Sequence, residues 1–102
     1  MNINKMMKQM QKMQKDLQKT QAELADREVE ASVGGGKITV KANGAGEVLS
    51  IKIDPAVVDP EDVEMLEDLI LSGVKQAIDQ GKEMAADEMG KVTGGLPPGL
   101  GI

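Results

Sequence analysis

Hydrophobic side chains recur at heptad spacing through residues 2 to about 27, and Thr20 interrupts the series. The apolar positions are Ile3, Met6, Met10, Met13, Leu17 and Leu24. This spacing, with no Gly or Pro between, predicts one helix about 39 Å long. A helix of that length cannot bury its apolar seam on a small sheet alone, so we expect these six residues to form a dimer seam.

The period changes from that of a helix to that of a strand over residues 28–53. Three alternating segments, separated by glycine-rich turns, predict a three-stranded antiparallel meander. A tight loop at Gly35-Gly36 would pair Val33 with Ile38 and Ala31 with Val40, and would place Glu30 opposite Lys41. Residues 43–46 form the second turn, and Leu49, Ile51 and Ile53 are the apolar positions of the third strand. We expect positive φ at Gly44 and at one or both of Gly35 and Gly36.

A second long helix follows, with Asp59 as its N-cap and Pro60 in its first turn. Its apolar stripe is formed by Val63, Leu66, Ile70, Val74, Ala77 and Met84, widened by Leu69 and Ile78. Small residues recur every four positions at Gly73, Ala77, Gly81 and Ala85. This row either lets another helix approach closely or leaves the helix locally loose.

The predicted fold class is therefore α+β with the order α-β-β-β-α. Residues 1–90 form a single domain, and residues 91–102 form a flexible Gly/Pro-rich tail whose Leu96, Leu100 and Ile102 belong to a frayed end or dock on a partner. A small core without aromatic side chains buries little area, so we expect an obligate dimer.

The 102-residue chain contains no His, Cys, Phe, Trp or Tyr. This composition removes the usual soft-metal ligands, the cysteine nucleophile, the imidazole base and the aromatic stacking platform. We therefore expect no enzyme activity, no cofactor, no metal and no small-molecule substrate. No apolar run has the length of a membrane span and no signal peptide is evident, so we expect a cytoplasmic protein without a membrane partner.

Two other groupings have structural interpretations. The glycine clusters lie between strands and not before a helix, which favours turns over a phosphate-binding loop. The acids Asp54, Asp59, Glu61 and Asp62 lack the spacing of a calcium loop, and helix capping accounts for them.

Charge is divided between the ends of the chain. Residues 1–20 carry five lysines against Asp16, whereas residues 59–89 carry ten carboxylates against two lysines. The five lysines, Lys5, Lys8, Lys12, Lys15 and Lys19, step by three and four and so line one helix face. This lysine stripe is either a solvated face or a track for DNA phosphates, and the lack of compensating acid favours phosphates.

The stripe contains no Arg, so we expect backbone contacts and no bidentate readout of base edges. Secondary candidates for DNA binding are Lys37, Lys41 and Lys52 on the sheet. We expect the acids of the second helix to face away from bound DNA; they are Glu61, Asp62, Glu64, Glu67 and Asp68. The methionines at 6, 10 and 13 are either packing residues or an adaptable surface for protein clients, which leaves a helical-tweezer chaperone or scaffold as the alternative function.

An ordered set of motifs resembles the YbaB/EbfC family of bacterial nucleoid-associated proteins. The motifs are MKQMQKMQ at 7–14, GKITV at 36–40, NG at 43–44, IDP at 53–55 and MLEDL at 65–69. The resemblance covers residues 5 to about 80 and implies a tweezer-like homodimer of α-β-β-β-α subunits that binds double-stranded DNA in the nucleoid. Relatives often carry basic residues near the third strand and second helix, where this chain has LSIK at 49–52 and Asp79-Gln80. That departure shifts the expected DNA contacts towards the lysine stripe.

Overall fold

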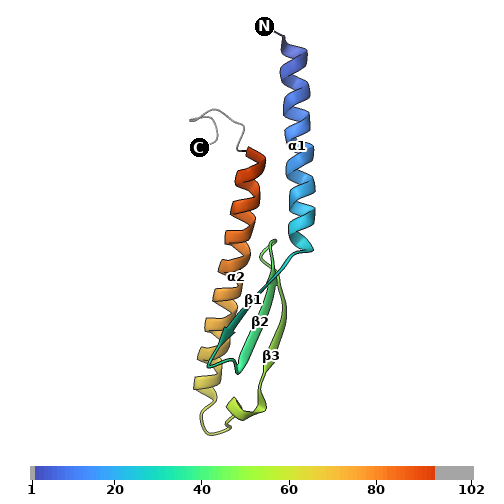
Figure 1. Ribbon diagram of the computed structural model, residues 1–102. Coiled ribbons are helices and arrows are strands. Elements are labelled where there is room, and N and C mark those ends of the chain that lie inside the picture. Colours follow the sequence, from blue (N-terminus) through green and yellow to red (C-terminus); the bar gives the residue numbers. More distant parts are fainter. Residues whose placement is uncertain (1, 94–102) are drawn as a thin grey trace.

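The computed structural model describes residues 2–93 and shows the predicted α+β order of elements. The elements are α1 (Ile3–Ala25), β1 (Glu28–Val33), β2 (Ile38–Asn43), β3 (Val48–Ile53), a 3₁₀ turn η1 (Pro55–Val57) and α2 (Val63–Thr93). The molecule is elongated, with extents of 71 × 24 × 16 Å. The sheet lies against the first part of α2, whereas α1 runs beside the last part of α2 and extends beyond it (Figure 1).

The three strands form the predicted antiparallel meander in the order β1-β2-β3. The register pairs Val33 with Ile38 and Glu30 with Lys41, as the alternating pattern predicted. In the first turn, the amide of Lys37 donates to the carbonyl of Gly34 at 3.4 Å. Gly35 and Gly36 have φ of 68° and 87°, which confirms the prediction for this turn and is typical of a type I′ hairpin.

The second turn differs from the prediction, because Gly46 has positive φ (82°) and Gly44 does not. The side chain of Asn43 builds this turn, since its Oδ1 accepts hydrogen bonds from the amides of Ala45 and Glu47, each at 3.0 Å. Gly44 is required for a different reason. A Cβ at that position would lie 2.8 Å from Cδ2 of Leu24, so the glycine permits close contact with α1.

Helix α2 begins at Val63, later than predicted, and Asp59 is not its N-cap. The carboxylate of Asp59 instead accepts the amide of Glu61 at 2.9 Å in a local turn that contains Pro60. Asp62 takes the capping position, because its Oδ1 accepts the amide of Met65 at 3.3 Å. The local Asx turn therefore competed successfully with the helical start that the Asp-Pro pair suggested.

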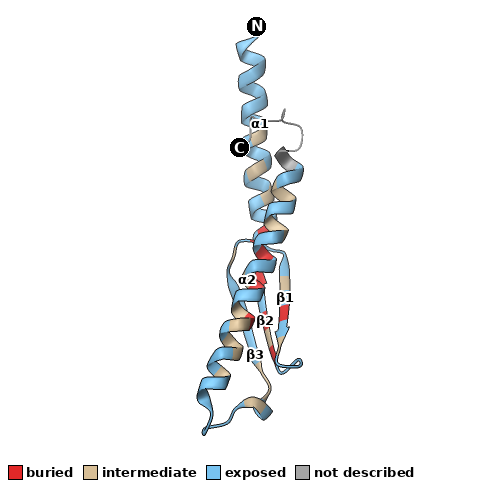
Figure 2. Ribbon diagram, turned by 90° about the vertical axis from the view of Figure 1, so that its left-hand side faces the viewer, coloured by how far each residue is buried: buried red, intermediate tan, exposed pale blue. Residues whose placement is uncertain are grey.

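The core lies where α2 crosses the sheet, and Figure 2 shows the buried residues concentrated there. Its fully buried members are Ala31, Ile38, Val40, Ala42 and Ala77. Of the row of small residues on α2, Gly73, Ala77 and Gly81 face the sheet, whereas Ala85 lines a groove shared with Leu24 of α1. A Cβ on Gly73 would lie 2.9 Å from Cγ2 of Val40, and a Cβ on Gly81 would collide with the carbonyl oxygen of Asn43. Close helix–sheet packing thus explains the four-residue spacing.

Strand β3 is an edge strand that α2 leaves largely uncovered. Ile51 is paired with Val40 in the register, yet 43% of its surface is exposed, and Val48 and Leu49 are exposed as well. A β-bulge interrupts the β2–β3 register between Lys41 and Ala42. The chain alone therefore leaves an apolar surface at β3, which we call the β3 surface (Val48, Leu49 and Ile51).

Helix α2 continues to Thr93, three residues into the segment predicted as a tail. The rest of that segment, including Leu96, Leu100 and Ile102, lies outside the described residues.

Replacing Gly81 by Ala is expected to destabilise the fold by about 2 kcal/mol, even though Ala favours a helix by up to about 1 kcal/mol over Gly. The added methyl group must displace the backbone of Asn43. Gly90→Ala is the matched control, because a Cβ there meets no atom within 4 Å and the helix gains propensity. Urea unfolding of both variants checks the prediction, and equal stability of the two would contradict the packing described.

Candidate nucleic-acid interface

The five lysines of the stripe lie on α1, which begins after Asn2. The side chain of Asn2 accepts the amide of Lys5 at 3.2 Å and caps the helix. All five lysines are exposed, and none forms an ion pair within residues 2–93. From Lys5 to Lys19 the stripe runs about 21 Å along the helix, a length matched by about six phosphates of one DNA strand.

The seam predicted on α1 divides into two parts in the single chain. Leu24 is buried, and Met13, Leu17 and Thr20 are half-buried in the part of α1 that lies beside α2 (Figure 2). The first part is bare, with Ile3 and Met10 each 66% exposed and Met6 50% exposed. Half of α1 is therefore anchored to the molecule, and half projects as an arm with lysines and methionines on its surface.

A buried asparagine fixes the anchored end of α1. Asn43 is only 2% exposed, and its Nδ2 donates to the carbonyl of Ala25 at 3.1 Å and to Oε1 of Glu47 at 3.0 Å. The Asn43 side chain thus satisfies a free carbonyl at the C-terminal end of α1 while its Oδ1 holds the β2–β3 turn. Such a fully bonded buried amide specifies one arrangement of the groups around it.

Gly44 completes the joint. Its amide donates to the carbonyls of Leu24 and Arg27, at 2.9 and 3.2 Å. The sequence pattern identified Asn43 and Gly44 only as turn residues. Their second role depends on residues about twenty positions earlier, and no local periodicity reveals that contact.

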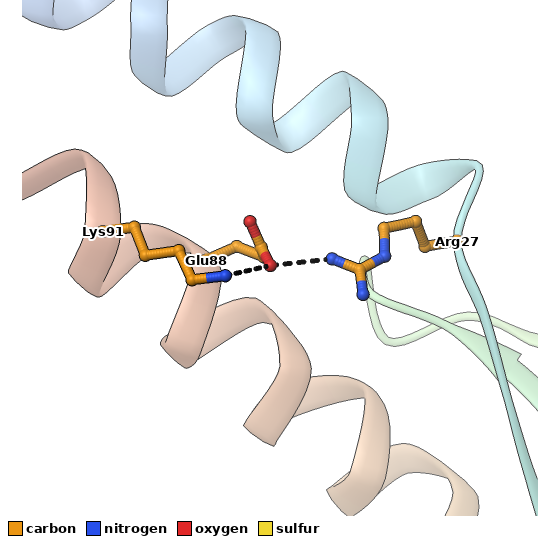
Figure 3. Close-up of polar contacts among 3 residues, drawn as sticks. All are labelled: Arg27, Glu88 and Lys91. Carbon is orange, nitrogen blue, oxygen red and sulfur yellow. Dashed lines mark hydrogen bonds and ion pairs between the residues drawn. The ribbon is translucent and has the colours of Figure 1, made fainter.

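An ion pair connects the same joint to α2 (Figure 3). Nη1 of Arg27 lies 2.9 Å from Oε1 of Glu88, and Nζ of Lys91 lies 3.1 Å from the same oxygen. The hydrogen bond from Arg27, followed by the one from Lys91, lowers the pKa of Glu88 below its usual value of 4.5. The i,i+3 spacing of Glu88 and Lys91 could have been recognised in the sequence, but the contact with Arg27 could not.

The secondary lysines occupy a more mixed environment on the sheet. Lys41 and Lys52 border a shallow depression of about 540 Å³, together with Glu30, Thr39 and Ser50. Lys41 is opposite Glu30 in the register, which offsets part of its charge. This face is therefore weaker than the stripe as a cationic surface.

Lys37 lies 3.4 Å from the carboxylate of Asp54. The hydrogen bond from the amide of Ala56 is the main cause that lowers the pKa of Asp54, and Lys37 adds to it against the opposing effect of burial. An Asp54 that stays ionised keeps Lys37 paired within the chain. Lys37 is thus less available to phosphate than the lysines of α1.

The acids at the start of α2 and just before it lie far from the stripe. The five acids between Glu61 and Asp68 are exposed at the end of the molecule where α2 begins, opposite the end from which α1 projects (Figure 1). Charge is thus separated along the long axis, and the cationic arm extends away from the acidic end.

Within residues 2–93, no three metal-ligating side chains come together in a group that could hold an ion. A search of the helices in that range also found none with the length and hydrophobicity required to cross a membrane.

Comparisons with known proteins agree on one family. The profile of the YbaB/EbfC DNA-binding family matches residues 1–96. A nucleoid-associated protein of Alkaliphilus metalliredigens is 64% identical over 100 residues, covering 97% of this chain and 88% of that protein. A nucleoid-associated protein of Moorella thermoacetica is 60% identical over 95 residues, covering 93% and 91%.

A solved structure shares the fold. The crystal structure of an uncharacterized protein from Helicobacter pylori superposes with a TM-score of 0.75 at 22% identity, covering 85% of this chain and 91% of that chain.

Replacing Asn43 by Ala is expected to destabilise the protein by about 2–3 kcal/mol, because the part-buried carbonyl of Ala25 and the amides of Ala45 and Glu47 lose their partner. Hydrogen exchange at the amides of Ala45 and Glu47 should also accelerate. Asn2→Ala, which removes one exposed cap, should cost only about 1 kcal/mol. Urea unfolding and exchange measured by NMR check this, and an Asn43→Ala protein as stable as the Asn2→Ala protein would contradict the role of the joint.

Proposed function

Because the chain belongs to the YbaB/EbfC DNA-binding family, we propose that it acts in the bacterial nucleoid by binding double-stranded DNA through its backbone phosphates. The contacts come from Lys5, Lys8, Lys12, Lys15 and Lys19 on α1. The protein's role is in chromosome organisation or gene regulation. It acts in the cytoplasm as a homodimer and has no enzymatic activity.

The observation that supports this proposal best is the unpaired state of the stripe. Five exposed lysines share one helix without an ion pair to any residue of the described chain, whereas Lys37 and Lys91 are paired. Release of counterions from DNA favours such an array of unpaired cations. An arm without Arg, His or aromatic side chains has few means to read base edges, so the preference for sequence is modest.

The dimer has two apolar surfaces available. The β3 surface lies on the rigid sheet beside the core, and the bare part of the α1 seam supplies Ile3, Met6 and Met10. We place the centre of the interface at the β3 surface, because Ile51 continues the core face of the sheet and a second copy would complete its burial. The bare part of the seam provides the second contact.

The alternative function, a tweezer-like chaperone or scaffold, is favoured by one observation. Met6, Met7 and Met10 are exposed together on the projecting arm, and methionine suits adaptable apolar surfaces. Salt separates the two functions, because DNA binding through phosphates weakens steeply with salt, whereas apolar client binding does not.

Replacing one lysine of the stripe by Ala should lower the slope of log affinity against log salt by about 1 and weaken all duplexes similarly. If all five lysines of one stripe neutralise a phosphate, affinity should fall about 500-fold between 50 and 200 mM salt. Lys75→Ala and Lys82→Ala on α2 are matched controls, because they remove the same charge from exposed positions outside the stripe.

Fluorescence anisotropy with specific and random duplexes at several salt concentrations measures these slopes. A folded variant that lacks all five lysines but keeps the parental affinity and slope would exclude the stripe. The contacts would then come from Lys37, Lys41 and Lys52.

Sedimentation equilibrium at micromolar concentration should show a dimer and no folded monomer. Ile51→Lys should dissociate the dimer and reduce folding cooperativity, because it buries a charge at the centre of the interface. Met10→Lys should have a smaller effect. The reverse ranking would move the centre of the interface to α1, and a stable parental monomer would contradict the dimer altogether.

A further inference from the structure

The direction of α1 depends on a very short connection. Only Asp26 and Arg27 separate the end of α1 from the start of β1. Small rotations at this joint would move the far end of a 23-residue helix, about 34 Å long, through a large arc. How well the lysine stripe follows a duplex therefore depends on how firmly the joint is held.

Apolar packing at the joint is incomplete. A groove of about 400 Å³, half open to solvent, lies between α1, α2 and the β2–β3 turn. It is lined by Gln21, Leu24, Gly44, Ala45, Ala85 and Met89. Side chains do not interdigitate across this open groove as they do in a packed interior, so the packing here does not by itself fix the angle between the helices.

A polar contact spans the same region. Arg27 reaches from the joint to Glu88 on α2, and the carboxylate oxygen that it contacts also contacts Lys91 (Figure 3). The side chain of Glu88 is 28% exposed and that of Arg27 is 50% exposed, so the contact is shielded from water on the Glu88 side only. The ion pair and Asn43 hold the joint through different elements, one through α2 and the other through the β2–β3 turn.

We propose that Glu88 is a positioning residue for DNA binding: it holds Arg27 and so keeps α1 at an angle where the lysines of one stripe meet one duplex together. This proposal rests on the proposed function of the stripe. It assigns to an acidic residue a favourable effect on binding to an anionic polymer.

The direction of the change in DNA affinity when Glu88 is replaced provides the test. Removing a carboxylate ordinarily strengthens DNA binding, because it reduces repulsion of phosphate. Asp87→Asn is the matched control, since Asp87 is the neighbouring acid, is exposed and has no ion pair within residues 2–93. It should bind DNA as tightly as the parent or more tightly.

Glu88→Gln should do the opposite. If the aligned state of α1 becomes a minor one, affinity should fall by about three- to tenfold. Fewer lysines would engage at once, so the salt slope should fall by about 1 as well. A purely structural role for Glu88 would not change the slope in a protein whose circular dichroism and dimerisation are unchanged.

A distance measurement tests the positioning directly and without DNA. The chain has no cysteine, so Gln9→Cys and Gln80→Cys place spin labels on α1 and α2 without changing its charge. Labelled protein is mixed with an excess of unlabelled protein, so that distances within one chain dominate. The distance distribution should broaden in Glu88→Gln and equally in Arg27→Gln, and the double variant should add nothing, because both remove the same contact.

The outcomes separate the two proposals. The positioning role would be overturned if Glu88→Gln bound DNA like Asp87→Asn, or if its distance distribution stayed narrow. Loss of binding in the variant that lacks all five lysines would still support the stripe in that case. If the variant without the five lysines binds DNA normally, the proposed function of the stripe is wrong, and the positioning role in DNA binding is overturned with it even where the distances broaden.

Discussion

The end of β2 contacts both helices, and the short distances in these two contacts determine the rest of the architecture. The carbonyl of Asn43 lies against Gly81 of α2, and Gly44 lies against Leu24 of α1. Each contact requires a glycine on one side, since a Cβ would force the elements apart. Because both contacts are short, Nδ2 of the Asn43 side chain reaches the free carbonyl of Ala25. This hydrogen bond holds the end of α1 on the sheet. The fold thus joins the end of α1 to the sheet through one buried polar residue.

The absence of aromatic residues explains why this constraint matters. The fully buried core consists of aliphatic side chains and alanines over one crossing of α2 and the sheet. Such a core buries a modest area, so stability depends on close approach and on completed hydrogen bonds. It also leaves the β3 surface and the arm of α1 uncovered, and these are the surfaces proposed above for a second copy and for DNA. The small buried area of the core and the exposure of these two surfaces therefore have the same cause.

Local patterns were sufficient to predict the secondary structure and the strand register. The alternation around Gly35-Gly36 predicted the pairing of Val33 with Ile38, because a one-residue slip would turn every side chain to the wrong face. Most errors arose where distant residues decide the outcome, although a local Asx turn at Asp59 displaced the predicted start of α2. Gly44 looked like a residue that needs positive φ, but glycine is required there because a Cβ would clash with Leu24. The first three residues of the four-residue row on α2 pack against the sheet. Likewise, the lysine stripe follows from helical periodicity, whereas the ion pair of Arg27 with Glu88 depends on tertiary structure and could not be found by spacing.

The arm of α1 also has an electrostatic weakness that fits its proposed role. The first turn of α1 contains no acid, and Lys5 lies in that turn, near the positive end of the helix dipole. Successive lysines at spacings of three and four also repel one another along the face. Both effects destabilise an isolated helix, and the bare part of the arm has no packing within the described chain to compensate. Phosphate oxygens placed along the stripe would relieve the repulsion and the unfavourable dipole interaction together. Phosphates along the stripe would therefore further stabilise the helix of the arm.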